Sequence, residues 1–111
     1  MEFEKDTKEC KGIKFSLKKD GKEIARATLY VMSNDLHEEP FGLMEDVMVD
    51  EELRGQGIGT ELVKKIIEEA KEQKCYKLIA TSRHSREKVH ELYERLGFEN
   101  HGLEFRMDFQ I

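Results

Sequence analysis

The 111-residue chain contains no tryptophan, one proline and two cysteines, and the scarcity of cysteine excludes two classes of protein. Cys10 and Cys75 lie far apart and belong to no Cys-x-x-Cys or Cys/His cluster, which argues against a disulfide framework and a structural zinc site. The four histidines lack the spacing that places two metal ligands on one helix face, so we expect no metal. We therefore expect a reduced, cytoplasmic protein.

Long apolar runs and an excess of positive charge are also missing. No stretch approaches the roughly 18 apolar residues of a membrane span, and residues 1–11 are charged rather than signal-like, which predicts a soluble protein with no membrane partner. The net charge of -5 argues against a nucleic-acid partner and predicts that an anionic ligand is held by local donors. A chain of this length can bury one core, so we expect residues 1–111 to form a single domain.

Alternating apolar residues predict a hairpin in the first third of the chain. The first run contains Ile13, Phe15 and Leu17, and the second contains Ala25, Ala27, Leu29 and Val31. Asp20-Gly21 stands between them, and an Asp-Gly pair between two alternating runs is a strong signal for a tight hairpin. Residues 33–42, which include the only proline, are expected to form the one long loop.

The middle of the chain predicts a strand, a helix and a second strand. Residues 43–49 carry apolar side chains on both faces, as does an interior strand covered on two sides, although Glu45 and Asp46 put two charges in its centre. Residues 58–70 have the apolar spacing of an amphipathic helix, and residues 76–81 are expected to form a short buried strand. This order predicts a right-handed parallel crossover.

The last third of the chain predicts a helix and a strand. Apolar residues at helical spacing mark the helix: Val89, Leu92, Tyr93 and Leu96. Ser82 or Ser85 is available to cap its start, and Gly97 is placed to end it in the left-handed conformation. Residues 103–109 alternate between apolar and polar side chains and predict a C-terminal strand, and a short strand near residues 1–7 is a further candidate. The element order predicts an α/β fold with a mixed sheet (α+β).

A glycine-rich segment joins the predicted central strand to the first predicted helix, and we call it the glycine corner. It consists of Arg54, Gly55, Gln56, Gly57, Ile58, Gly59 and Thr60. The first N–H groups of a helix lack intrahelical partners and carry partial positive charge, and glycines let a diphosphate approach them closely. A P-loop is excluded because no lysine follows Gly59 before Lys64. A Rossmann turn fits poorly because Thr60 stands where its third glycine belongs.

The glycine corner matches the pattern Arg/Gln-x-x-Gly-x-Gly/Ala and resembles the acyl-CoA diphosphate loop of the GNAT superfamily of N-acetyltransferases. Residues 44–50 resemble the central strand of that family, and residues 92–98 resemble its helix-ending motif Phe/Leu-Tyr-x-x-x-Gly-Phe. The three motifs come in the family's order, and the resemblance covers residues 29–111. It implies a GNAT-like fold and transfer of an acetyl group from acetyl-CoA to a primary amine of a small molecule or protein.

The resemblance also implies how acetyl-CoA is held. In the family, the backbone of the strand that matches Val47, Met48 and Val49 holds the acetyl and pantetheine parts, and the amides of the glycine corner hold the diphosphate. Arg86 stands where the family often has an asparagine that contacts the cofactor. With Arg83 it is available to clamp an anionic group on CoA or on the acceptor; two exposed arginines near a helix start are the alternative.

Two residues are candidates for proton transfer. Glu45 matches the general base of several small-molecule members of the family, and an ion-paired or solvated strand carboxylate is the alternative. Tyr93 matches the tyrosine near the thioester sulfur and would act as the acid, although its spacing alone is that of a core aromatic residue. Asp46 is expected on the face of the strand opposite to Glu45 and is the weaker candidate for the base.

The sequence departs from the family between its first two strands. Family members usually place two helices there to cover the acceptor, whereas this chain has a tight hairpin. We therefore expect an acceptor side that is open, or completed by a second subunit in a homodimer or by the loop 33–42. Residues 45–47 and 75–77 also resemble aminosugar-phosphate acetyltransferases. In the loop 33–42, by contrast, the acidic residues Asp35, Glu38 and Glu39 suit a cationic amine or a basic protein tail. The alternative function is a non-catalytic CoA-binding or protein-interaction module, and nucleotide binding is a distant third.

Overall fold

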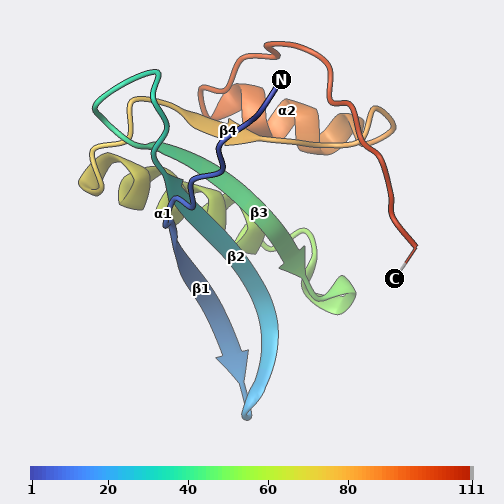
Figure 1. The fold of residues 1–111 in the computed structure, drawn as a ribbon. Coiled ribbons are helices and arrows are strands. Elements are labelled where there is room, and N and C mark those ends of the chain that lie inside the picture. The colour runs from blue at the N-terminus through green and yellow to red at the C-terminus, as the bar shows by residue number, and fades with distance from the viewer. Residues whose placement is uncertain (111) are drawn as a thin grey trace. The chain divides into compact units, whose positions relative to one another are not determined.

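The hairpin predicted around Asp20-Gly21 is present in the computed structural model, which describes residues 1–110 (Figure 1). β1 (Lys11–Lys19) and β2 (Lys22–Met32) pair antiparallel, and Asp20 and Gly21 have φ values of +53° and +77°. Two successive positive φ values are those of a type I′ turn, whose twist matches that of the paired strands. The loop that follows β2 covers residues 33–40 and is two residues shorter than predicted, because Phe41 and Gly42 belong to the next strand.

The four strands form one mixed sheet in the order β1-β2-β3-β4. β3 (Phe41–Val49) pairs antiparallel with β2 and parallel with β4 (Leu78–Ala80), and α1 (Ile58–Glu72) connects β3 to β4. The predicted parallel crossover and the mixed α+β fold are therefore confirmed. β4 has three residues and is shorter than the predicted strand 76–81. It is not buried as predicted, because Leu78 and Ala80 are half-buried and Ile79 is exposed.

The chain divides into two compact units, and the first covers Met1–Ala80. The core of this unit lies between α1 and one face of the sheet (Figure 1). Its largest fully buried side chains are Leu29 of β2 and Val63 and Ile66 of α1. Alanines at two buried positions of β2, Ala25 and Ala27, present no bulk beyond Cβ to the helix. Within this unit α1 covers only one face of β3, so the expectation of a strand covered on both faces is met on that face alone.

The second unit, from Thr81 onward, contains α2 (Glu87–Arg95). Its N-cap is Arg86, which makes no side-chain cap, so the predicted cap by Ser82 or Ser85 is wrong. The segment before the helix is held by the His90 ring instead, which lies 2.8 Å from the backbone oxygen of Arg83.

Gly97 ends α2 as predicted, with φ +104°. The Gly97 N–H donates to the Glu94 carbonyl at 3.1 Å, and the Phe98 N–H donates to the Tyr93 carbonyl at 2.9 Å. These two bonds form a Schellman motif. The rings of Tyr93 and Phe98 also lie 5.3 Å apart, which supplies the apolar contact that often accompanies the motif.

Two predicted strands are absent from the described chain, at residues 103–109 and 1–7. The alternating side chains of the C-terminal segment are exposed to between 71% and 90%: Leu103, Phe105, Met107 and Phe109. Alternation alone does not make a strand, because the backbone groups of a strand need a neighbouring strand, and residues 81–110 contain no other strand to provide one. No helix within residues 1–110 is long and apolar enough to cross a membrane.

Candidate functional site

A β-bulge interrupts β3 at its two adjacent acidic residues. Thr28 of β2 lies opposite Glu45, and Arg26 lies opposite Met48, so two residues of β3 face a single residue of β2 between these pairs. The first of the two is Asp46, with φ +55°. This left-handed conformation costs a residue with a Cβ atom roughly 1–2 kcal/mol, and a bulge of this type usually carries glycine there.

The bulge places Asp46 on the same face of the sheet as Glu45, so the expectation that the two point to opposite faces is wrong. Arg26 and Thr28 share a face because they are two residues apart on β2, and Thr28 pairs with Glu45. The Arg26 guanidinium donates to Asp46 from Nε at 2.8 Å and from Nη2 at 3.1 Å. The extra residue in β3 reverses the alternation, because a shift of one residue moves each later side chain to the other face.

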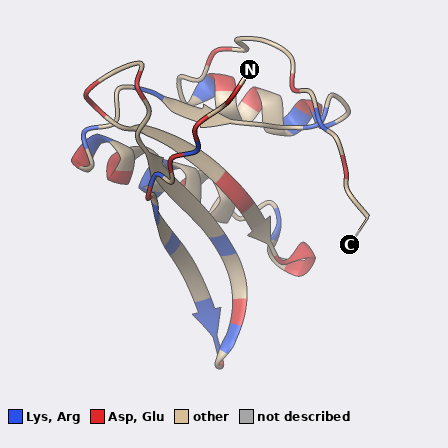
Figure 2. Cartoon of the chain, in the orientation of Figure 1, with Lys and Arg blue, Asp and Glu red and all other residues tan. Residues whose placement is uncertain are grey.

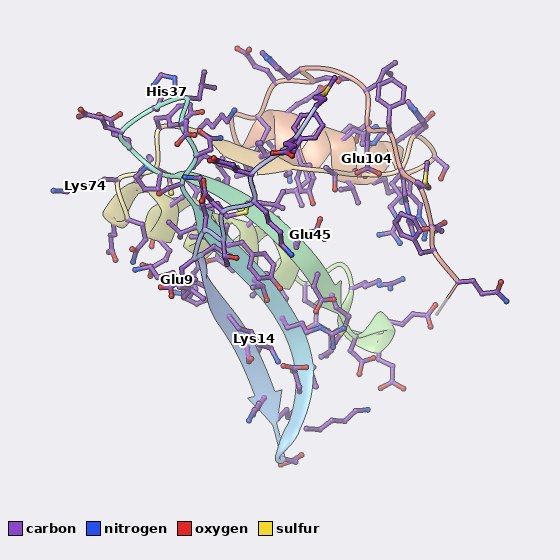
Figure 3. The ribbon with its side chains drawn as sticks, viewed as in Figure 1. Glu9, Lys14, His37, Glu45, Lys74 and Glu104 are labelled. Carbon is purple, nitrogen blue, oxygen red and sulfur yellow. The ribbon has the colours of Figure 1, made fainter. Side chains whose placement is uncertain are left out.

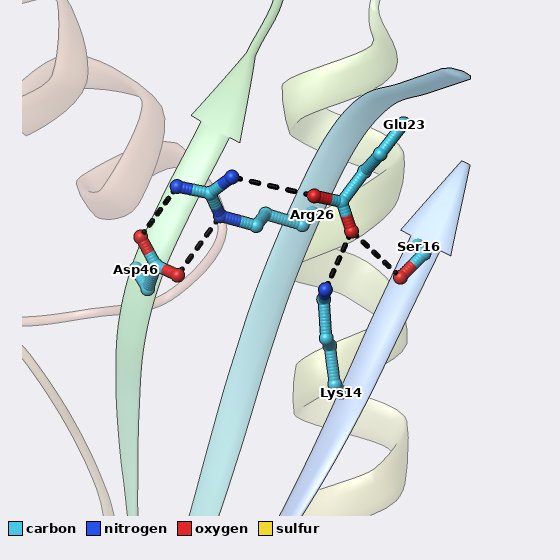
Figure 4. A network of polar contacts seen from close by, with 5 residues as sticks. All are labelled: Lys14, Ser16, Glu23, Arg26 and Asp46. Carbon is cyan, nitrogen blue, oxygen red and sulfur yellow. Dashed lines mark hydrogen bonds and ion pairs between the residues drawn. The ribbon is translucent and has the colours of Figure 1, made fainter. Parts of the chain in front are cut away.

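A polar network connects Asp46 to both strands of the hairpin, β1 and β2 (Figure 4). Arg26 also donates to Glu23 at 3.3 Å, and Glu23 accepts from Lys14 at 2.6 Å and from Ser16 at 3.1 Å. The Lys14 ammonium lowers the pKa of Glu23, and the hydrogen bonds from Arg26 to Asp46 raise the pKa of Arg26. A bidentate arginine within such a network is held far more firmly than an isolated surface ion pair.

Glu45 differs from its neighbour because its carboxylate is exposed and makes no hydrogen bond or ion pair with residues 1–110. It lies in a row of cross-strand neighbours with Thr28 and Lys14, on the face that α1 does not cover (Figure 3). β4 pairs with β3 only as far as Met44. The outer edge of residues 45–49 therefore pairs with no strand of the first unit, and an unpaired strand edge is a place where an extended ligand can form backbone hydrogen bonds.

An acidic 3-10 turn, η1 (Glu51–Leu53), follows β3 and leads into the glycine corner (Figure 2). The Asp50 carboxylate accepts from the Glu52 N–H at 3.3 Å and so caps the turn. At its other end, Arg54 Nε donates to the Val49 carbonyl at 3.4 Å. These two bonds fix the polar insert between β3 and the glycines, so the corner begins at a defined place beside the end of the strand.

The glycine corner leaves a helix start open. Gly55 and Gly57 have φ values of +86° and +81°, and nothing lies within 4 Å of the position that a Cβ would take on either. Gly57 is the N-cap of α1 and supplies no side chain, and the first bond of the helix runs from the Glu61 N–H to the Gly57 carbonyl at 3.1 Å. The three N–H groups of residues 58–60 therefore have no intrahelical acceptor. An open helix start flanked by left-handed glycines fits a diphosphate.

The two remaining candidates, Arg86 and Tyr93, belong to the second unit. They are two turns apart on α2 and so lie on one side of the helix. Arg86 is exposed, as is Arg83. Tyr93 is half-buried and its ring lies against Phe98, so it has the structural contact that its spacing indicated.

The model of the acetyltransferase (GNAT) family matches residues 2–98. The chain belongs to this family. A solved structure of a putative acetyltransferase from Agrobacterium tumefaciens str. C58 is 30% identical and superposes with a TM-score of 0.80, over 88% of this chain and 69% of that one. The fold and the family inferred from the three motifs are confirmed.

Two curated relatives of the GNAT chain carry similar names. A "glucosamine 6-phosphate N-acetyltransferase" from Trypanosoma brucei brucei is 40% identical over 67 residues, which cover 60% of this chain and 44% of the relative. A "probable glucosamine 6-phosphate N-acetyltransferase 2" from Oryza sativa subsp. japonica is 35% identical over 68 residues, 61% of this chain and 39% of the relative. The aligned part of the chain thus spans less than half the length of these relatives.

In this GNAT chain the structure joins some of the candidate residues and adds others. Glu45, the backbone of residues 47–49 and the glycine corner are neighbouring segments of the first unit, whereas Arg86 and Tyr93 are held on α2. The pair of Arg26 and Asp46 was not predicted from the sequence. Its signal was present in the two adjacent acids within a strand, because Asp tolerates the left-handed conformation better than most residues.

Proposed function

We propose that this GNAT chain transfers an acetyl group from acetyl-CoA to a primary amine. The glycine corner carries the proposal: two left-handed glycines leave the N–H groups of residues 58–60 open. One 3-10 turn separates this corner from β3, whose outer edge pairs with no strand of the first unit beyond Met44. Within a member of this family, such an arrangement supports binding of an extended thioester that ends in a diphosphate.

The chain's own groups divide the binding between them. Acetyl-CoA supplies the activated acetyl thioester. The amides of Arg54, Gly55, Gln56, Gly57, Ile58, Gly59 and Thr60 are proposed to hold the diphosphate, and the backbone of Val47, Met48 and Val49 is proposed to hold the pantetheine and acetyl parts. An N–H of this edge would stabilise the thioester oxygen as it gains negative charge.

Proton transfer is assigned to the two titratable candidates. An amine with a pKa of about 10 is mostly protonated at neutral pH and must lose a proton before it attacks. Glu45 is proposed to accept that proton, through a water molecule, because its carboxylate is exposed and unpaired within residues 1–110. As the new C–N bond forms and the C–S bond breaks, the Tyr93 hydroxyl is proposed to protonate the thiolate.

The acceptor that we propose is a small amino sugar phosphate, with glucosamine 6-phosphate as the first compound to test. Both curated relatives are named for this substrate. Arg83 and Arg86 supply two exposed guanidinium groups near the start of α2, and guanidinium groups bind phosphate through paired hydrogen bonds. We propose that Arg86, with Arg83, contacts either the acceptor phosphate or the phosphates of CoA.

The test is release of free CoA thiol from acetyl-CoA in the presence of glucosamine 6-phosphate, glucosamine, a polyamine or a lysine peptide. We expect turnover with at least one of these amines, and Glu45→Gln should lower kcat by about a hundredfold, as expected for loss of a general base. Glu68→Gln is the matched control, because it removes an exposed carboxylate of α1 that has no proposed role and should leave kcat unchanged. The absence of turnover with every amine would overturn the proposal.

A second function is favoured by one observation. No helix of the first unit covers the sheet face that carries Glu45, so this unit by itself gives an acceptor no helical cover. A non-catalytic CoA-binding module would bind acetyl-CoA in calorimetry with the same dependence on the glycine corner. It would release no thiol with any amine, and that result would favour the module over the enzyme.

We also propose a cytoplasmic location. Both cysteines are free, Cys10 exposed and Cys75 half-buried. Burial raises the pKa of the Cys75 thiol, which keeps it protonated and unreactive. Free thiols persist in a reducing compartment, and this supports the location.

A further inference from the structure

We propose that Arg26 is a positioning residue for acetyl transfer, because it holds Asp46 in the bulge and so fixes where Glu45 and the backbone of residues 47–49 stand. The inference rests on the proposed function. It concerns a residue of the neighbouring strand, whose part is to set the shape of β3 rather than to take part in the chemistry.

The left-handed conformation in the bulge is stabilised by side-chain contacts, because the residue that adopts it is not glycine. Asp46 has φ +55°, a conformation that Asp tolerates better than most residues but that still costs free energy in a residue with a Cβ atom, so contacts that hold its side chain stabilise the bulge. The Asp46 side chain is 58% exposed, so packing does little to hold it. The two hydrogen bonds from Arg26, at 2.8 and 3.1 Å, are its side-chain contacts with the neighbouring strand.

Arg26 is in turn held from its other side. Its Nη1 lies 3.3 Å from a Glu23 oxygen, and the second oxygen of that carboxylate binds Lys14 and Ser16 of β1 (Figure 4). Contacts with residues of β1 and β2 therefore orient the guanidinium toward Asp46 of β3. A planar guanidinium held at both ends fixes direction as well as distance, which a flexible lysine ammonium does not do.

The position of the bulge decides how the candidate site is arranged. Glu45 immediately precedes it, and the backbone proposed to hold the thioester begins at its second residue, Val47. If Asp46 relaxed to an extended conformation, the residues after it would shift by one position and their side chains would change faces. A displacement of about 1 Å at reacting groups can reduce a rate by about a hundredfold. Loss of the hydrogen bonds from Arg26 to Asp46 should therefore lower kcat.

A direct role for Arg26 predicts a different result. If its guanidinium bound an anionic group of the acceptor, its removal would raise the KM for the acceptor, and no change at Asp46 would compensate. If it holds the bulge, glycine at position 46 should make it dispensable, because glycine adopts a positive φ without help.

The test compares Arg26→Met with the double variant Arg26→Met/Asp46→Gly. We expect Arg26→Met to lower kcat by about tenfold with the KM for acetyl-CoA within about threefold, and the double variant to recover kcat to within about threefold of the parent. Arg26→Met/Asp46→Ala should not recover, because alanine shares the Cβ penalty. Lys18→Met, which removes an exposed cation of β1, is the control and should leave kcat unchanged. Failure of the glycine variant to recover, or a rise in acceptor KM alone, would overturn the proposal.

A second readout is independent of turnover. In amide NMR spectra, Arg26→Met should shift the resonances of residues 45–49, and the added Asp46→Gly change should return those of residues 47–49 toward their parent positions. If the parent chain transfers no acetyl group, the proposed function fails, and these spectra still decide the role of Arg26. Unchanged resonances in Arg26→Met would overturn the inference.

Discussion

Two helix ends of this molecule carry a left-handed glycine and use it for opposite purposes. At the end of α2, Gly97 with φ +104° lets the chain reverse direction. The N–H groups of Gly97 and Phe98 donate hydrogen bonds to carbonyls of the last turn of the helix. At the start of α1, Gly57 with φ +81° also turns the chain, but no side chain caps the helix there. The first end is satisfied by the protein's own hydrogen bonds, whereas the second leaves the N–H groups of residues 58–60 without an intrahelical acceptor.

The difference shows that a glycine conformation does not by itself indicate a site. What distinguishes the two ends is the fate of the backbone groups beside the glycine. A helix end whose backbone groups are hydrogen-bonded (a closed end) stabilises its unit. A helix start with unpaired N–H groups (an open end) can instead bind an anionic ligand. The same substitution at the two glycines should therefore produce two different losses.

The largest effect is expected at the open end. Gly57→Val forces a β-branched residue into a left-handed conformation and displaces the N–H groups of residues 58–60. We expect the Kd for CoA to rise by about a hundredfold, which corresponds to roughly 2.7 kcal/mol. Calorimetric titration measures it, and a circular dichroism spectrum like that of the parent shows that the variant is folded. An unchanged Kd would remove the distinction between the two ends.

The matched change at the closed end is Gly97→Val. The same strain should lower the free energy of unfolding by about 2 kcal/mol, through loss of the left-handed turn and of its two hydrogen bonds. The Kd for CoA should stay within about twofold of the parent, since no open donors are lost. Urea unfolding and calorimetry measure the two quantities. A large loss of CoA affinity without a loss of stability would show that this end binds a ligand as well.

Tyr93 tests whether the closed end also contributes a reacting group. Tyr93→Phe keeps the ring that lies 5.3 Å from Phe98, so the free energy of unfolding should fall by no more than about 1 kcal/mol. If the hydroxyl is the acid, kcat should fall by at least about tenfold while the Kd for CoA is nearly unchanged. Steady-state kinetics decides between the catalytic and the structural role of Tyr93. An unaltered kcat would leave Tyr93 with the structural role alone.

The smallest effect is expected at Gly59, the third glycine of the corner. It has no positive φ, and a Cβ there would meet Val49 Cγ2 at 3.8 Å, an ordinary contact. Gly59→Ala should raise the free energy of unfolding by about 0.5–1 kcal/mol, because alanine favours a helix, and should change the Kd for CoA by less than about threefold. A loss as large as that in Gly57→Val would mean that the corner tolerates no side chain at any of its glycines.

Turns that depend on one or two residues could be predicted from the sequence. Asp20-Gly21, the glycine corner and Gly97 each act through the φ values of one or two residues, so the sequence alone predicts their turns. The bulge at Asp46 was not predictable in the same way, because it depends on a register set by β2 and on a guanidinium from Arg26. The alternation of residues 103–109 was misleading, because a strand also requires a partner.

The most direct test of the central claim compares the binding of CoA with that of pantetheine, which has the same thiol arm but no diphosphate. If the open start of α1 holds the diphosphate, calorimetry should give a Kd for CoA at least about tenfold lower than that for pantetheine, and this preference should disappear in Gly57→Val. Equal affinities for the two compounds, or no binding of CoA by the parent chain, would contradict the account.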